Sequence, residues 1–262
     1  MKTLILPARY TPDSIALSGA AVEAGWQVER LPSWRPPSHL RLSAAAIYGE
    51  PLFGAVVAAE LSLVLLEPPL GWLAGLPREY LSREVTFTTL DIAKRCRGHA
   101  FIKPADDKCF PAAVYPNGSA IPGDALPDTV PVIIAEPVPW DVEFRFFILN
   151  RLAAAFSPYI RRGAPMQAGD SATEATPEET HAAVEFCGRL LTDSVIPIPP
   201  AVVIDVGRID GRGWAVVEAN AAWASGIYGC DAGRVLEVIA RACRRREDVG
   251  SEERLWVVER NL

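Results

Sequence analysis

The fold is decided by two β-branched runs around a glycine-rich turn, Val202-Val203-Ile204-Asp205-Val206-Gly207 and Trp214-Ala215-Val216-Val217-Glu218-Ala219-Asn220. Runs of this kind favour strands, and a glycine at the first position of a two-residue loop favours a type II′ turn. The pattern therefore predicts a β-hairpin with Gly211-Arg212 as its loop. In that register Asp205 stands opposite Glu218, and Asn220 lies on the same face two residues further on.

The predicted face carries two carboxylates and an amide. This set suits Mg²⁺, which takes a few protein oxygens and completes its shell with phosphate oxygens and water. Like charges opposed across a ladder repel, so a nearby cation is expected as well. A loop of Asp210-Gly211 would shift the pairing by two residues and keep this face, whereas a three-residue loop would destroy it. The alternative is a solvated face with ordinary surface acids. The small residues before Ser225-Gly226 favour close approach to a bound group instead.

The composition bounds the class of protein. The chain has 262 residues, of which 50% are hydrophobic and 22% charged, and its net charge is −6. A negative chain does not attract nucleic acid through a general basic field, so no nucleic-acid partner is expected. The five cysteines are scattered and lack a CxxC pair, which argues against a disulfide framework and favours the cytoplasm. The sequence holds no uninterrupted apolar stretch of about 18 residues, so no membrane partner is expected.

Strand-like and helix-like segments alternate through the N-terminal third of the chain. This alternation predicts an α/β layer with a parallel sheet. Strands are expected at residues 4–6, 27–31 and 45–48, with helices at 11–25 and 51–60. From Phe101 onward, short strands between Pro and Gly turns predict antiparallel pairing instead.

Two helices are expected in the C-terminal part. Thr176, Pro177 and Glu179 form the capping box that begins the first, which runs to about residue 191. Asp231 caps the second, which is expected to reach Arg246, so that the basic run at 244–246 complements the helix dipole. The polar stretch 163–176 has no periodicity and is predicted to be a mobile loop.

Two further strands carry charged side chains among apolar ones. Lys103 lies inside the run 101–104, where burial demands an anionic partner, either a phosphate or a nearby carboxylate. An apolar strand ends at Glu136, and a proline-interrupted connector leads to a strand in which Glu143 and Arg145 share one face. Those two residues can pair with each other, while the connector can hold a purine through its backbone groups.

Taken together, these segments resemble the ATP-grasp superfamily, and within it a small clade. The matching motifs are F-x-K-P at 101–104, E-P-V-x-W-x-x-E-x-R at 136–145, and D-V-G at 205–207 with E-x-N-x-x-W-A-S-G at 218–226. The resemblance covers roughly residues 101–231 and implies an α/β (α+β) ATP-grasp fold. It implies an N-terminal α/β domain over 1–98 and a nucleotide-binding region over 99–262. That region divides into a lid subdomain, 99–137, and a C-terminal subdomain, 138–262, which enclose the nucleotide.

The family implies nucleotide contacts for several residues. Lys103, on the central strand, and Lys108, on the phosphate-covering loop, would contact the phosphates of ATP. Glu136 and the backbone of Val138 would hold the adenine. The loop at 105–110 departs from the family pattern because it contains no glycine.

The remaining matches imply ribose, substrate and metal contacts. Glu143, seven residues after Glu136, matches the acid that binds the ribose hydroxyls. Arg145 resembles an arginine that reaches phosphate or substrate, so Arg145 and Lys103 are the expected catalytic residues. The family's magnesium triad is matched by Asp205, Glu218 and Asn220, in agreement with the hairpin geometry.

The resemblance implies an ATP- and Mg²⁺-dependent ligase that forms C–N bonds through an acyl-phosphate and releases ADP. Its partners would be ATP and a small-molecule or peptide carboxylate, and a homodimer is an arrangement that the sequence leaves open. An ATP-grasp-type kinase and a catalytically inactive nucleotide-binding module are the alternatives. Tyr159, Arg161 and Arg162 are candidates for contacts with an anionic substrate and can equally form a solvated basic turn. Arg35, Tyr48 and Arg83 are further candidates, for which surface roles are favoured.

Overall fold

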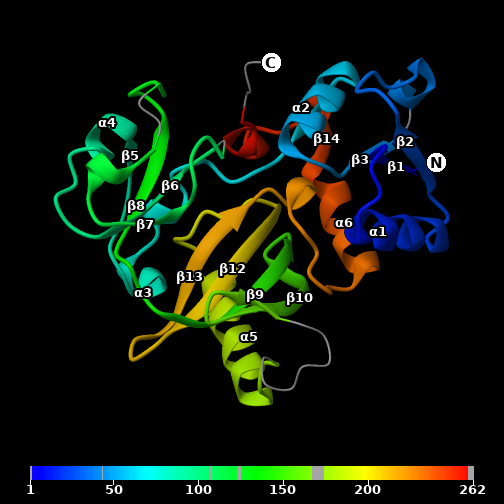
Figure 1. Ribbon diagram of the computed structural model, residues 1–262. Helices are drawn as coiled ribbons and strands as arrows, with labels where there is room; N and C mark the ends of the chain where they lie inside the picture. Colours follow the sequence, from blue (N-terminus) through cyan, green and yellow to red (C-terminus); the bar gives the residue numbers. More distant parts are fainter. Residues whose placement is uncertain (1, 43, 107, 123–124, 167–173, 259–262) are drawn as a thin grey trace.

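The computed structural model describes residues 2–42, 44–106, 108–122, 125–166 and 174–258. The chain forms an N-terminal lobe, a second lobe built on a four-stranded sheet, and a body built on a five-stranded sheet (Figure 1). It runs through them in that order and returns to the N-terminal lobe with its last helix. Within the described residues, no helix combines the length and the apolar character that a bilayer span requires.

The N-terminal lobe is an α/β layer, as the alternating pattern predicted. Its elements are β1 (Lys2–Pro7), α1 (Pro12–Glu23), β2 (Gln27–Leu31), β3 (Ala44–Ile47), α2 (Pro51–Glu60) and β4 (Leu63–Leu65). The strands β2, β1 and β3 form a parallel sheet in that order. Thr11 caps α1 through its side chain, and Gly25 follows the helix with a φ of 72°, which glycine adopts without strain.

The second lobe is an antiparallel sheet. In spatial order it contains β5 (Val85–Thr89), β8 (Pro131–Ala135), β6 (Ala100–Pro104) and β7 (Ala113–Tyr115). The short helices α3 (Arg78–Leu81) and α4 (Leu90–Ala93) precede and follow β5. A small core, with Leu90, Ile102 and Val132 fully buried, holds this lobe together. Because β5 enters the sheet from before position 98, the lobe uses residues on both sides of the predicted domain boundary, which stays a prediction.

The body is a five-stranded antiparallel sheet. Its strands are, in spatial order, β11 (Ala164–Pro165), β10 (Leu152–Arg161), β9 (Trp140–Leu149), β12 (Ala201–Ile209) and β13 (Gly213–Asn220). Helix α5 (Pro177–Thr192) packs on one face through a core that includes Phe144 and Phe186. The predicted capping box begins α5, because Thr176 and Glu179 each accept the other's backbone N–H. The predicted mobile loop, 163–176, lies in part outside the described residues.

The strands β12 and β13 form the predicted hairpin with a different loop. The loop is residues 210–212, one residue longer than predicted. A three-residue loop in a regular hairpin would turn Glu218 away from Asp205. The pairing, however, shifts by one residue just beyond this pair, and Asp205 stands opposite Glu218 as predicted. The extra residue is Val217, which forms a β-bulge.

The bulge lets one strand serve two environments. In a regular strand, alternate side chains share a face, so Trp214, Val216, Glu218 and Asn220 would all point the same way. The bulge at Val217 separates them. Trp214 and Val216 belong to the core under α5, whereas Glu218 and Asn220 line a cleft on the other side of the sheet. Both the apolar and the polar residues of β13 are thereby placed where their chemistry requires.

The last helix, α6 (Ala232–Ala242), begins as predicted and ends earlier. The carboxylate of Asp231 accepts the N–H of Arg234 at 2.8 Å. The predicted end at Arg246 is wrong, because β14 (Cys243–Arg245) leaves the helix and pairs antiparallel with β4. This pairing satisfies backbone hydrogen-bonding groups of both strands. The basic run at 244–246 therefore does not complement a helix dipole.

The N-terminal lobe and α6 pack on the face of the five-stranded sheet that α5 leaves open. Their shared core includes Phe147 and Val203 from the sheet and Ile239 from α6. Trp223, in the segment after β13, is 1% exposed and packs against α2. A Cβ atom at Gly54 of α2 would lie 2.4 Å from Cζ3 of this ring, so the close approach requires glycine.

Gly54→Ala is expected to destabilise the protein by about 1–3 kcal/mol, because the added methyl group has no room beside Trp223. Gly19→Ala is the matched control, since Gly19 also lies in a helix but its added methyl group would meet no atom within 4 Å. The control should stabilise by up to about 1 kcal/mol through helix propensity. Urea unfolding followed by circular dichroism measures both changes. Equal effects of the two substitutions would contradict the packing of α2 on Trp223.

Candidate functional site

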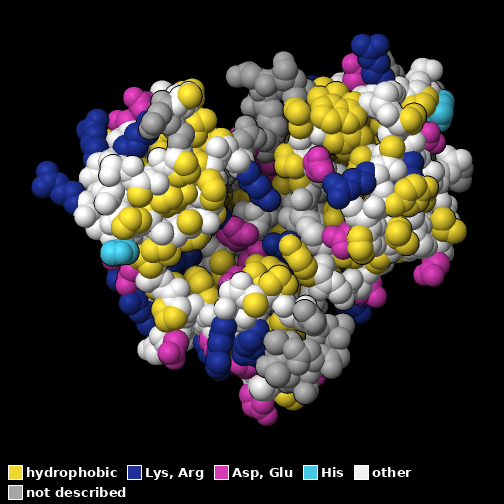
Figure 2. Space-filling model, viewed as in Figure 1, with side chains coloured by type: hydrophobic (Ala, Val, Ile, Leu, Met, Phe, Trp, Pro, Cys, Tyr) yellow, Lys and Arg dark blue, Asp and Glu magenta, His cyan; other side chains and the backbone are white. Residues whose placement is uncertain are grey.

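Two neighbouring cavities open where the three parts of the chain meet. The larger has a volume of about 850 Å³ and is lined by residues of both lobes and the body. The smaller, of about 340 Å³, lies between the four-stranded sheet and the connector from β8 to β9. Lys103 and Glu218 line both, so the two cavities adjoin at this pair. The surface is hollowed at this meeting point, with basic and acidic side chains inside the hollow (Figure 2).

Lys103 reaches from β6 of the second lobe to Glu218 on β13 of the body. Its ammonium group binds Oε2 of Glu218, and Nδ2 of Asn220 donates to Oε1 at 2.9 Å. The anionic partner that burial of Lys103 demanded is therefore a carboxylate. Burial raises the pKa of Glu218, but Lys103 and Asn220 outweigh it and lower that pKa to about 2. Glu218 is consequently ionised at neutral pH.

Arg145 and Asp205 form a buried pair beside these residues. Nε of Arg145 donates to Oδ1 of Asp205 at 2.9 Å and Nη2 donates to Oδ2 at 2.7 Å, a bidentate geometry. Nη1 donates to the carbonyl oxygen of Gly226 at 3.0 Å. The guanidinium also lies 5.0 Å from the ring centre of Tyr159 and 4.8 Å from that of Tyr228, within reach of cation–π attraction. Arg145 is thus fixed by contacts on several sides.

The three predicted metal ligands do not share one surface. Glu218 and Asn220 line the larger cavity. Asp205 has no exposed surface, and its oxygens are engaged by Arg145 and by the hydroxyl of Tyr159 at 3.2 Å. Asp205 therefore presents no surface to the cleft, in contrast to Glu218 and Asn220. Over the ranges that the structure describes, no group of three or more His, Cys, Asp or Glu side chains could hold a metal ion by itself.

Glu143 is buried next to the Arg145–Asp205 pair. Its side chain accepts a hydrogen bond from the hydroxyl of Tyr159 at 3.3 Å, and the residue is 7% exposed. Burial, followed by the charge of Asp205, raises the pKa of Glu143 to about 7. The sequence left open whether Arg145 pairs with Glu143. Its bidentate partner is Asp205 instead. The expected contact of Glu143 with ribose stays a prediction.

The connector from β8 to β9 forms one wall of the smaller cavity. Glu136 and Val138 line it, together with apolar residues of the four-stranded sheet. The hydrogen bond from Arg212 to Glu136, at 2.6 Å, lowers the pKa of this carboxyl group. Lys108 lines the larger cavity from the loop after β6. The structure thus gathers the predicted adenine and phosphate contacts around two adjoining cavities.

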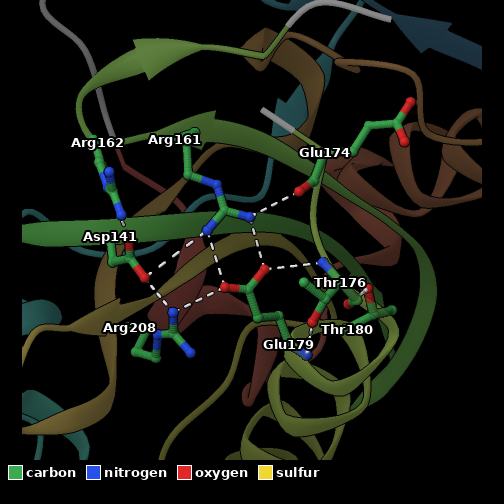
Figure 3. Close-up of polar contacts among 8 residues, drawn as sticks. All are labelled: Asp141, Arg161, Arg162, Glu174, Thr176, Glu179, Thr180 and Arg208. Atoms are coloured by element: carbon green, nitrogen blue, oxygen red, sulfur yellow. Dashed lines mark hydrogen bonds and ion pairs between the residues drawn. The ribbon is translucent and has the colours of Figure 1, made fainter. Parts of the chain in front are cut away.

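Arg161 and Arg162, two candidates for substrate contacts, are engaged by acids of the protein itself. Arg161 donates to the two oxygens of Glu179 at 2.9 and 2.7 Å (Figure 3). Arg208 bridges Glu179 and Asp141, and Arg162 donates to Asp141 at 3.1 Å. This network ties β9, β10 and β12 to the first turn of α5. Each of these arginines thus has a carboxylate partner within the protein.

Two residues with unexpected roles are Tyr48 and Arg83, which are 8% and 5% exposed. The hydroxyl of Tyr48 donates to Oδ2 of Asp13 at 3.2 Å, and the N–H of Ile227 donates to the same oxygen at 3.1 Å. Arg83 binds backbone carbonyls, one of them 133 positions away in the chain. No local pattern signals such roles, because only the tertiary fold brings the partners together.

The comparisons with known proteins bear on the family and the fold of the chain. A family profile described as ATP-grasp domain, R2K clade family 2, matches residues 80–238, which is more than half of the chain and spans every residue predicted to contact nucleotide or metal. A RimK domain ATP-grasp protein from Sphaerobacter thermophilus has a similar structure, with 17% identity and a TM-score of 0.52 over 91% of this chain and 99% of that one. The D-cycloserine synthetase DcsG follows with 15% identity and a TM-score of 0.50, over 91% and 98%. No curated protein matched.

The structural likenesses, at this low identity, speak for the fold alone, and they confirm the α/β (α+β) ATP-grasp fold expected from the motifs. The profile match adds the family, because it includes the lysine strand, the connector and the hairpin. The chain therefore belongs to the ATP-grasp domain family, R2K clade family 2.

Proposed function

We propose that the protein is an ATP- and Mg²⁺-dependent ligase, which activates a carboxylate as an acyl-phosphate and passes it to an amine or another nucleophile. The observation that carries this proposal is the junction of the two cavities at Lys103 and Glu218. A mostly apolar pocket of about 340 Å³ opens there into a more polar cleft of about 850 Å³. A purine in the pocket and phosphates in the cleft would place the phosphate chain beside Lys103.

The nucleotide contacts follow from that placement. Backbone groups near Val138 and the carboxylate of Glu136 lie in the pocket wall, where they would hydrogen-bond the adenine. Lys103 and Lys108 line the cleft and would oppose the charge of the phosphates. In this placement the adenine contacts apolar and hydrogen-bonding groups of the pocket, and the phosphates contact the two lysines of the cleft.

Glu218 and Asn220 fit a magnesium ion. Both line the cleft, Glu218 is ionised at neutral pH, and carboxylate and amide oxygens are the ligands that this ion prefers. Two protein ligands leave room for phosphate oxygens and water, which usually complete such sites. When bound, the ion would supply neutralisation of the charge on the β- and γ-phosphates. Asp205, which is fully buried, would be a third ligand only if it gained contact with the cleft.

The proposed reaction has two steps. The substrate carboxylate attacks the γ-phosphorus of ATP, so that a carboxyl O–P bond forms and ADP leaves. The nucleophile then attacks the acyl carbon, phosphate leaves with the bonding electrons, and the nucleophile loses a proton. Lys103 and Arg145, which line the cleft, oppose the negative charge that builds on the transferred group from fixed positions. The presence of a synthetase among proteins of similar fold favours bond formation over phosphorylation alone.

Calorimetry should show that the wild-type protein binds ATP about tenfold more tightly, or better, with Mg²⁺ than without it, a gain of about 1.4 kcal/mol per tenfold. Glu218→Gln combined with Asn220→Ala is expected to abolish this gain, because it removes the charge of one proposed ligand and the whole of the other. Glu185→Gln is the control, since this acid lies on α5 with 63% of its side chain exposed. An unchanged Mg²⁺ dependence in the double variant would remove the hairpin from the proposed site.

With Mg²⁺-ATP, a panel of carboxylates and amines should yield ADP, phosphate and a joined product detectable by mass spectrometry. Lys103→Met is expected to lower the rate by about 100-fold, the usual effect of removing one fixed group that stabilises transition-state charge. Lys94→Met is the control, because Lys94 pairs with the exposed Asp128. A phosphorylated substrate without a joined product would identify a kinase. Binding of Mg²⁺-ATP without turnover of any pair would identify a nucleotide-binding module.

A further inference from the structure

The strand β13 is an edge strand, and its outer carbonyls meet a single arginine. Spatially it lies last in the five-stranded sheet, so among the residues that the structure describes its outer backbone groups face no neighbouring strand. Nη1 of Arg83 donates to the carbonyl oxygen of Val216 at 2.8 Å, and Nη2 donates to that of Val217 at 3.0 Å. Nη1 also donates to the carbonyl oxygen of Leu81 at 3.1 Å. The guanidinium therefore bridges the segment before β5 to the bulge of β13.

The Arg83 side chain is buried and binds backbone groups of the protein itself. The residue is 5% exposed, and its guanidinium lies 4.8 Å from the ring centre of Trp140. Its hydrogen bonds go to backbone carbonyls, which a planar fork of donors can bridge two at a time. A lysine ammonium is a point charge on a flexible stem and cannot reproduce that geometry.

The two carbonyls that Arg83 binds belong to the bulge. A bulge disrupts the ladder locally and leaves backbone groups of the extra residue without strand partners. Here the extra residue is Val217. The bulge decides the face on which the following residues lie, and it turns Glu218 and Asn220 into the cleft while Val216 stays in the core. The hydrogen bonds that Arg83 donates to the carbonyls of Val216 and Val217 therefore stabilise the bulge, which sets the direction of the proposed metal ligands.

We propose that Arg83 is a positioning residue, which holds the bulge at Val217 and thereby keeps Glu218 and Asn220 turned into the cleft. The role in metal binding rests on the proposed function, but the hold on β13 does not. Arg83 also lines the smaller cavity, but its hydrogen bonds go to the backbone carbonyls of Leu81, Val216 and Val217. It acts through the backbone of β13, from a segment that also leads into the first strand of the second lobe.

Arg83→Met tests this proposal, with Arg78→Met as the matched control because the Arg78 side chain is 67% exposed and pairs with a surface acid. The first measurement is the ratio of ATP affinities with and without Mg²⁺, in protein shown to be folded by circular dichroism. We expect Arg83→Met to lower this ratio by about tenfold or more, the usual loss when a group that orients a metal ligand is removed. The control should keep the wild-type ratio. A folded Arg83→Met protein with the wild-type ratio would overturn the proposal.

The second measurement needs no nucleotide and is hydrogen exchange of peptides covering 214–220. Exchange should quicken in Arg83→Met, while peptides of β9 and β10 should be unchanged. If the wild-type protein gains nothing from Mg²⁺, the proposed function fails, and unchanged exchange in β13 would then overturn the role of Arg83 separately. If Arg83→Met does not fold, Arg83→Lys decides: a reduced ratio supports the proposal, and a wild-type ratio with wild-type exchange overturns it.

Discussion

Two carboxylates opposed across one pair of strands set the main constraint on this molecule. Asp205 and Glu218 face each other in the ladder of β12 and β13, and Asp205 is fully buried. Such a pair is tolerated only when cations offset the repulsion and the burial of charge. One cation, Arg145, comes from the neighbouring strand β9, and the other, Lys103, comes from the second lobe. The same charges thus shape the sheet and join it to a separate lobe.

The position of the two cations divides the carboxylates by function. Both oxygens of Asp205 accept hydrogen bonds from Arg145, and Asp205 has no exposed surface. Asp205 therefore holds Arg145 in place. Glu218 stands in the wall of the cleft with Asn220, where a metal ion or a phosphate can be reached. A motif that resembles three equivalent ligands along the chain therefore consists in space of two half-buried residues that line the cleft and one fully buried residue that holds Arg145.

The hairpin shows how core packing and site chemistry are reconciled in one strand. Trp214 and Val216 stabilise the body only inside the core, whereas Glu218 and Asn220 would be costly there. All four residues are separated by even numbers of positions, so a regular strand would place all of them on the same face. The bulge at Val217 resolves the conflict, and the edge position of β13 leaves its outer carbonyls open to a donor from elsewhere in the chain.

The local pattern was enough for much of the fold. The alternation at the N-terminus, the capping box at Thr176 and the hairpin itself were predictable, because each depends on residues close together in the chain. The opposition of Asp205 and Glu218 was also predicted, although the loop was wrong by one residue. The end of α6 was mispredicted, since its cause is the distant strand β4.

By itself, the sequence determined the family and much of the order of the elements, and it predicted the charged residues of the proposed site, since these depend on local periodicity, turn chemistry and motif spacing. Only the tertiary structure decided which charges meet. Lys103 pairs with Glu218, and Arg145 pairs with Asp205 rather than with Glu143. Arg83 donates hydrogen bonds to the backbone carbonyls at the bulge. The physical reason is that each of these contacts joins segments far apart in the chain, whose approach is set by how the lobes and layers pack and not by any local preference.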